Sequence, residues 1–198
     1  MRSHRAQLVR RGIRTVASNT VQIRARTPEI RPMTPADIPA IARLMAGSTT
    51  WERYGIDATQ AASTLAGFVE KSSHDPDDYT CLVAEQDLQV VGFVVLLFYG
   101  CFGMSGYIKL IGTREDRRRM GVGRLLLGAA EALAFARGPN VFLLVSHFND
   151  PAIRFYERMG YRRIGVIEDY VVPGIDEFLY RKSVGPIHPD SGRELLPV

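Results

Sequence analysis

The sequence predicts a single α/β domain of the α+β type, built on one mixed sheet. Two strand-like segments, 79–86 and 90–100, are separated by only three residues, which is typical of an antiparallel hairpin. A third strand, predicted at 106–113, is followed by a helical pattern over 121–137 and a continuous apolar run over 141–148. This order predicts that 106–113 and 141–148 are parallel strands joined by a right-handed crossover.

The part of the chain before this sheet carries helix signals. Residues 29–33 form a short extended piece, and residues 34–37, TPAD, have the pattern that caps and starts a helix. A second helix is expected from Asp57, with Gln60 completing its capping box. The segment between these helices, residues 48–55, is predicted to be a loop.

The C-terminal part is expected to close the fold with a helix and a hairpin. A short helix starts at Pro151 and stops at Gly160, and two strands follow at 161–172 and 176–182. About four helices therefore flank the sheet. The buried face of the helix predicted at 121–137 is expected to consist of Val122, Leu125, Leu126, Ala129, Leu133 and Ala136.

Composition excludes several classes of protein. A length of 198 residues with 46% apolar side chains suits one globular domain. The net charge is +4, but residues 1–28 hold seven arginines and no acid, so the remainder carries about −3. This distribution argues against a nucleic-acid partner. No apolar run approaches the roughly 18 residues that a membrane span needs, so no membrane partner is expected either.

Residues 1–28 are expected to be a disordered, basic extension. The same composition is found in mitochondrial transit peptides, so a mitochondrial location stays open beside the favoured cytoplasmic one. The folded domain is expected over 29–184, and 185–198 is expected to be a loose tail. Cys81 and Cys101 lack metal or redox spacing, which indicates free thiols in a reducing compartment and no metal site.

A glycine pair after the third strand forms the pattern R-x-x-G-x-G over 118–123. Free amide groups at a helix N-terminus bind phosphate oxygens, and glycines let the backbone approach a pyrophosphate closely. A charged surface turn is the alternative interpretation. A dinucleotide-binding fold would need a third glycine where Leu126 stands, and the G-K-[S/T] sequence of a P-loop is absent.

The downstream segment NDPAIRFYERMGY, residues 149–161, is a second motif in a fixed order with the first. On these two motifs the chain resembles the GNAT superfamily of N-acyltransferases over about residues 29–182. The resemblance implies an enzyme that takes acetyl-CoA as cosubstrate, needs no metal, and acetylates an amine by direct attack. It favours a phosphate cradle over a surface turn at 118–123.

The resemblance also assigns residues to coenzyme A. The two parallel strands would splay apart, and the pantetheine arm would pair with the free strand edge near Ile111 and Thr113. Gly112 would mark a bulge or a close backbone approach, and Asn149 would either contact the coenzyme or form a cap or turn. The pyrophosphate would be held by Arg118 and by the backbone of Arg119, Met120, Gly121, Val122, Gly123 and Arg124.

Tyr156 matches the family tyrosine that lies near the coenzyme sulfur and acts as general acid, with core packing as the alternative. The base is open, because the glutamate that many relatives carry before the pyrophosphate loop is replaced here by Lys109. A water chain could serve, and the candidate side chains are Glu85, Glu168, Glu177 and His147, the last with a structural hydrogen bond as its alternative role.

The acceptor is expected to be an amine, of a small molecule rather than of a protein, and a homodimer through the C-terminal hairpin is compatible with this class. The acceptor pocket is expected between residues 48–55 and the two hairpins, lined by Trp51, Tyr54, Phe98, Tyr99, Phe102 and Tyr170. The alternative function is a non-catalytic coenzyme A-binding sensor or regulatory domain, which the lysine at position 109 keeps open.

Overall fold

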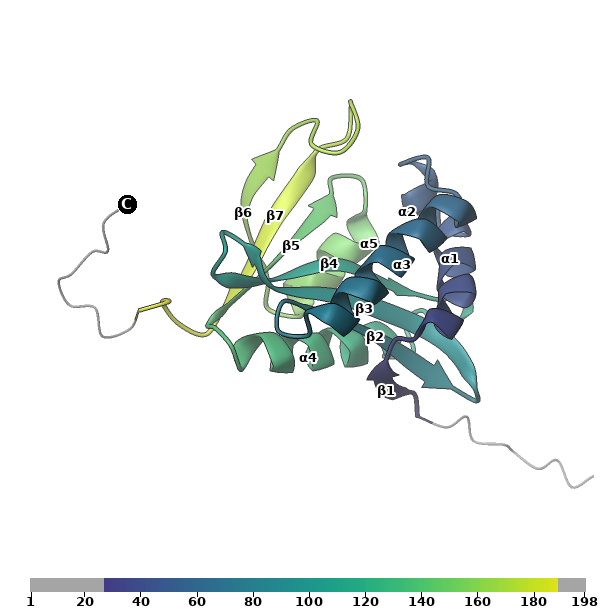
Figure 1. Cartoon of the computed structure of the whole chain (residues 1–198). Coiled ribbons are helices and arrows are strands. Elements are labelled where there is room, and N and C mark those ends of the chain that lie inside the picture. Colours follow the sequence, from purple (N-terminus) through teal and green to yellow (C-terminus); the bar gives the residue numbers. More distant parts are fainter. Residues whose placement is uncertain (1–26, 189–198) are drawn as a thin grey trace, which may run out of the picture.

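The computed structural model describes residues 27–188 and contains one seven-stranded sheet (Figure 1). The spatial order of the strands is β1-β2-β3-β4-β5-β7-β6. All neighbours are antiparallel except β4 and β5, as predicted. The predictions for residues 1–26 and 189–198 lie outside the described residues. The strands are β1 (Glu29–Pro32), β2 (Tyr79–Gln86), β3 (Gln89–Cys101), β4 (Ser105–Thr113), β5 (Asn140–Ser146), β6 (Arg162–Ile167) and β7 (Glu177–Ser183).

Helices cover both faces of the sheet (Figure 1). Helices α1 and α3 pack on one face, and α4 and α5 pack on the other. None of the helices in residues 27–188 is long and apolar enough to cross a membrane. The helical segments are η1 (Pro35–Asp37), α1 (Ile38–Ala46), α2 (Thr49–Glu52), α3 (Ala58–His74), η2 (Glu115–Arg117), α4 (Val122–Phe135) and α5 (Asp150–Arg158).

The parallel pair β4–β5 separates part-way along its length. The two strands are paired only over 106–108 and 141–143, and from there on β4 is bonded to β3 and β5 to β7. A register shift against β3 makes Lys109 an extra residue in β4, and such a bulge bends the strand. Figure 1 shows β5, β6 and β7 turning away from β4 beyond this point. The separation of the two strands beyond residues 108 and 143, called the splay below, confirms the expectation. The bulge lies at Lys109 rather than at Gly112.

The predicted buried face of α4 is partly wrong. Leu125 is 37% exposed and Leu133 is 38% exposed, whereas Leu127, Ala130 and Ala134 are buried. Leu125, Leu126 and Leu127 are consecutive and therefore point to different sides of the helix, so helical periodicity alone fits two faces. Contact with the sheet selects one of them, because Ala134 packs against the bare backbone of a glycine on β4. A Cβ at Gly106 would lie only 2.9 Å from Ala134 Cβ.

Arg31 on β1 ties the first helical turn to the sheet edge. Its guanidinium donates two hydrogen bonds of 2.8 Å to the Asp37 carboxylate and bonds of 2.9 and 2.5 Å to Glu85 on β2. Asp37 also accepts bonds from the backbone N–H and the hydroxyl of Thr34. The hydrogen bonds from Arg31 are the main reason why the pKa of Asp37 is lowered to about 2.

Asp37→Asn is expected to lower the free energy of unfolding by about 1–3 kcal/mol at pH 7, because a charged hydrogen-bond acceptor is lost. The folded-state pKa of Asp37 lies below its ordinary value of 3.8. The stabilisation is therefore present above that value and is lost as the pH falls toward about 2. Urea unfolding from pH 7 to pH 2 checks this result. A difference between wild type and variant that stays constant with pH would contradict it.

Candidate active site

The loop between β4 and α4 presents a row of unpaired amide groups. Arg119 has φ = +63° and Gly121 has φ = +86°, so two of its residues are in the left-handed region, which is uncommon for a residue such as Arg119. Helix α4 begins at Val122 with no acidic residue in its first turn. Within residues 27–188 the backbone N–H groups of 119–124 have no hydrogen-bond acceptor. Six free amides at a helix N-terminus are suited to bind an anion.

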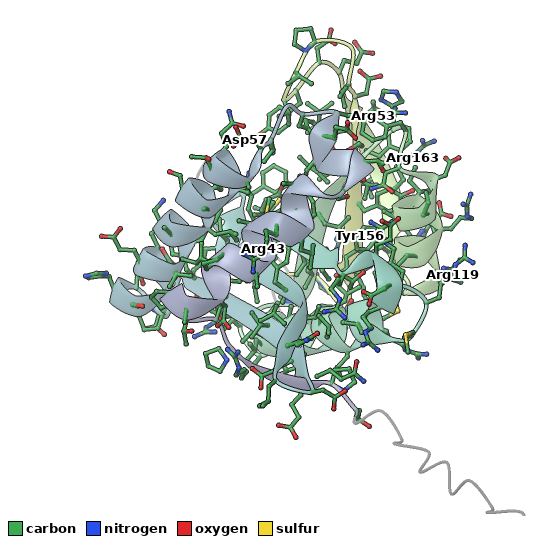
Figure 2. All side chains as sticks on the ribbon, turned by 90° about the vertical axis from the view of Figure 1, so that its right-hand side faces the viewer. Arg43, Arg53, Asp57, Arg119, Tyr156 and Arg163 are labelled. Atoms are coloured by element: carbon green, nitrogen blue, oxygen red, sulfur yellow. The ribbon has the colours of Figure 1, made fainter. Side chains whose placement is uncertain are left out.

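The side chains of this loop add positive charge. Arg118 is about half exposed, and its guanidinium lies 3.5 Å from the exposed Glu115 carboxylate. In the described part of the chain, no ion pair is formed by Arg119 or Arg124. Figure 2 shows Arg119 at the periphery of the molecule. Guanidinium groups here can donate to phosphate oxygens beside the positive end of the helix dipole.

The amide row meets the end of β4 and helix α5 at Gly123. A Cβ on Gly123 would lie 3.6 Å from the Phe155 ring and 3.7 Å from the Thr113 methyl group. The predicted cradle residues therefore lie next to Thr113, one of the two strand residues expected to pair with pantetheine. Ile111 and Thr113 belong to the part of β4 that has no pairing with β5. The free edge that the sequence analysis expects is present.

Gly112 is a site of close approach by a side chain. An added Cβ would lie 2.6 Å from Trp51 Cη2 and 2.8 Å from Phe93 Cε1. Trp51 comes from α2, in the segment 48–55 that was predicted to be a loop and is instead a one-turn helix followed by a turn. Its ring also contacts Phe93, with ring centroids 5.9 Å apart. The indole thus docks α2 onto β4.

Tyr156 lies on α5, beside the amide row. The residue is 7% exposed and its ring packs against Tyr161, with centroids 5.8 Å apart. Figure 2 shows Tyr156 in the interior of the view, inward of α5. Its hydroxyl makes no hydrogen bond to any described residue. Burial raises the pKa of Tyr156, with a smaller contribution from Tyr107, so the hydroxyl stays protonated at neutral pH and can donate a proton.

Helix α2 is tied to both sides of the splay. On one side Trp51 covers Gly112 of β4, and on the other Thr50 Oγ1 accepts a 3.3 Å bond from Asn149 Nδ2, just after β5. Asn149 Oδ1 accepts from Ala152 N at 3.3 Å and so caps α5. The structure shows Asn149 in the capping role, and its contact with coenzyme stays a prediction.

A third connection across the splay is polar and buried. The Tyr54 hydroxyl lies 2.6 Å from Ser146 Oγ at the end of β5, and it donates a hydrogen bond to the Glu177 carboxylate at the start of β7. Ser146 is 6% exposed and Glu177 is 4% exposed. These residues are 92 and 123 positions away from Tyr54 in the sequence. No local pattern could have predicted the cluster.

The structure separates the four side chains that were candidate bases. Glu85 is bound to Arg31 at the β1–β2 edge, away from the splay. Glu168 is exposed, and His147 Nδ1 accepts a 3.0 Å bond from the backbone N–H of Asp176, as its alternative role predicted. Glu177 alone is buried at the splay, where burial raises its pKa against the opposing effect of the bonds from Tyr54 and Ser146.

The aromatic pocket predicted for the acceptor is not assembled as expected. Phe98 is buried beneath the Arg137 guanidinium, which lies 3.5 Å from the ring centroid. Phe102 packs on Phe142 at the opposite end of β4, beside a hollow of about 470 Å³. The prediction was wrong because Phe98, Tyr99 and Phe102 lie where β3 turns into β4, and the splay is at the other end of β4. Tyr54 is at the splay, and Tyr170 is an electrostatic neighbour of Tyr107.

The chain matches known proteins over the part that contains this site. The model of the Acetyltransferase (GNAT) family matches residues 44–161, which include the amide row and Tyr156. The N-alpha-acetyltransferase of Sulfurisphaera tokodaii is 31% identical over 108 residues, which are 49% of this chain and 65% of that protein. The matched segment thus spans less than two thirds of that relative.

Two solved structures share the fold over nearly their whole length. Ard1 of Thermoplasma volcanium is 27% identical, with a TM-score of 0.64, over 81% of this chain and all of that one. The PaiA N-acetyltransferase of Thermoplasma acidophilum, solved in complex with coenzyme A, has the same TM-score at 21% identity, over 80% and 99% of the two chains. The sheet order, the splay and the matched family together show that the chain belongs to the GNAT acetyltransferase family.

Proposed function

We propose that the protein is an N-acetyltransferase that moves an acetyl group from acetyl-CoA to an amine. The observation that carries the proposal is the row of six unpaired amides at 119–124, placed against the free edge of β4. The row would hold the pyrophosphate together with Arg118, Arg119 and Arg124. The free edge at Ile111 and Thr113 would pair with the amides of the pantetheine arm.

Tyr156 is proposed as the general acid. The amine nitrogen forms a bond to the acetyl carbon while the carbon–sulfur bond breaks and the electron pair of that bond goes to sulfur. The leaving sulfur then takes a proton from the Tyr156 hydroxyl. The proton that the nitrogen then loses replaces the one that Tyr156 gives to sulfur. The free hydroxyl at the inner end of the site and the raised pKa of Tyr156 support this role.

Tyr156→Phe is expected to lower kcat by about 100-fold with the affinity for acetyl-CoA unchanged, because only the transferable proton is removed. Tyr161→Phe is the matched control, since it removes the hydroxyl of the adjacent buried tyrosine. Steady-state kinetics with calorimetric titration of acetyl-CoA check both variants. Equal loss of activity in the two variants would mean that the ring environment matters and not the Tyr156 proton.

Two acceptor classes are proposed. The resemblance of the sequence to its family favours a small-molecule amine, whereas the name of the Sulfurisphaera relative favours the α-amine of a protein or peptide. A defined panel separates them, made of twenty peptides Xaa-Ala-Ala-Ala with each standard first residue, spermidine and an aminoglycoside. Release of free thiol from acetyl-CoA is measured for each. Acetyl-CoA binding without release of thiol by any amine would favour the non-catalytic sensor instead.

A further inference from the structure

The buried polar cluster of Tyr54, Ser146 and Glu177 has a composition unlike the other buried carboxylates of the fold. Asp37 is paired with Arg31, and Glu131 is paired with Lys182 at 2.7 Å. The hydrogen-bond partners of Glu177 are two hydroxyl groups, and in the described part of the chain it forms no ion pair with a lysine or arginine.

A carboxylate that is removed from water without a cation is destabilised. Such a group is stabilised if it takes up a proton or if a cationic ligand binds beside it. A site that receives an ammonium group would supply both, because the ammonium is a cation and can give up a proton. The composition of the cluster therefore suits an amine acceptor.

The position of the cluster places it on the acceptor side of the splay. Ser146 ends β5 and is the register partner of Glu177 on β7. Tyr54 follows α2, the helix that reaches from Gly112 of β4 to the end of β5. Arg53, the neighbour of Tyr54, also reaches the end of β5, because its guanidinium lies 4.3 Å from the Phe148 ring centroid.

Tyr107 on β4 interacts electrostatically with both the cluster and the proposed general acid. Burial raises the pKa of Tyr107, with further contributions from Tyr170 and Glu177, and Tyr107 in turn contributes to the raised pKa of Tyr156. The cluster and Tyr156 are thus electrostatic neighbours of one residue on β4, the strand that borders the splay. An amine and a thioester that react at the splay would have the cluster as a proton acceptor and the Tyr156 hydroxyl as a proton donor.

We propose that Tyr54 and Glu177 form a proton relay that deprotonates the acceptor ammonium. The inference rests on the proposed function. The ammonium gives a proton to the Tyr54 oxygen while the Tyr54 proton passes to a Glu177 oxygen, and the neutral amine attacks the acetyl carbon. The second proton lost by nitrogen replaces the one that Tyr156 gives to sulfur. Glu177 returns its proton through Tyr54 to solvent once the product has left.

In this scheme Tyr54 contacts the substrate and Glu177 acts through Tyr54. Ser146 orients the phenol. The other titratable or charged groups near Glu177 are His147 and Asp176 beside it in the chain or the sheet, Tyr107 on β4, Tyr170 in the β6–β7 loop and Arg53 on the α2 side. Lys109 is exposed in the bulge of β4.

The relay is tested by the pH dependence of kcat/KM, with the most active Xaa-Ala-Ala-Ala peptide of the panel as acceptor. Glu177→Gln and Tyr54→Phe are each expected to lower kcat/KM about 100-fold at pH 7. The deficit is expected to shrink to within a few-fold of wild type above pH 9. There the peptide α-amine, whose pKa is about 8, is already neutral and needs no base.

The matched controls are Glu157→Gln and Tyr180→Phe. These residues form another tyrosine–glutamate hydrogen bond, 3.1 Å long, between α5 and the same strand β7. Each control is expected to stay within about twofold of wild type at every pH, since neither group is hydrogen-bonded to Tyr54, Ser146 or Glu177. Calorimetric titration of acetyl-CoA into every variant should give the wild-type affinity, and this shows that each variant is folded. If Glu177→Gln fails to fold, Tyr54→Phe, which keeps the ring, carries the test alone.

Two results would overturn the relay. One is wild-type kcat/KM in Glu177→Gln or Tyr54→Phe at pH 7. The other is a deficit of equal size at pH 7 and pH 9.5, since a purely structural role would not be relieved by deprotonating the substrate. Failure of the wild type to turn over any amine in the panel is a separate outcome, which would overturn the proposed function and the relay with it.

Discussion

Gly123→Asp is expected to weaken acetyl-CoA binding by about 100-fold or more, equivalent to about 2.8 kcal/mol. The new carboxylate would stand among the free amides of the proposed cradle and repel the pyrophosphate. The protein itself has room for the side chain, because the nearest atoms to an added Cβ are 3.6 and 3.7 Å away. A carboxylate in the first turn of a helix also interacts favourably with the helix dipole. Thermal stability should therefore stay close to that of wild type.

The control for this variant is Gly128→Asp on the same helix. Gly128 is exposed, and no atom outside its own helix lies within 4 Å of an added Cβ. Calorimetric titration with acetyl-CoA should give wild-type affinity for this control. Wild-type affinity in Gly123→Asp as well would show that residues 119–124 form only a surface turn, and the enzyme proposal would have to be abandoned.

Gly112→Ala is expected to lower the free energy of unfolding by about 1–3 kcal/mol, because it overfills a tight contact. Its methyl group would overlap Trp51 Cη2 at 2.6 Å and Phe93 Cε1 at 2.8 Å. Gly128→Ala is the matched control, and in an exposed helix interior it should raise stability by about 0.5–1 kcal/mol. The displaced indole carries α2 with it, so the Gly112 variant should also lose activity. Chemical unfolding and peptide kinetics measure the two effects.

A double-mutant cycle tests whether the contact with Trp51 causes the destabilisation by Gly112→Ala. Trp51→Phe removes the ring atoms that meet the new methyl group, so Gly112→Ala should destabilise the Trp51→Phe background less than it destabilises the wild type. Contact residues are expected to show coupling of this kind, of about 0.5–3 kcal/mol. Additive effects would mean that α2 is not docked through this contact.

Much of the fold was predictable because its signals are local. The hairpin of β2 and β3 follows from a short connection between two apolar segments, and the parallel pair follows from the strand–helix–strand order. The capping boxes at Thr34 and Asp57 mark helix starts within four residues of chain. Residues 118–124 are contiguous, so the cradle could also be recognised from its pattern.

The predictions were wrong where contacts between residues distant in sequence determine the local structure. The segment 48–55 lacks a strong helical pattern, and α2 is a single turn that is docked by Trp51 on a glycine of another strand. The buried face of α4 includes Ala134, which packs on the bare backbone of Gly106, and Glu131 is tolerated in this face because Lys182 approaches from β7. None of these partners is near in sequence.

The sequence by itself determined the mixed sheet, its parallel pair and the glycine loop at the start of α4, because periodicity, capping and turn chemistry act over a few residues. Only the tertiary structure decided which carboxylate lies at the splay. Glu85, Glu168 and Glu177 are equally plausible as residue types. Burial and the hydroxyls of Tyr54 and Ser146 distinguish Glu177, and those contacts exist only after distant segments have packed together.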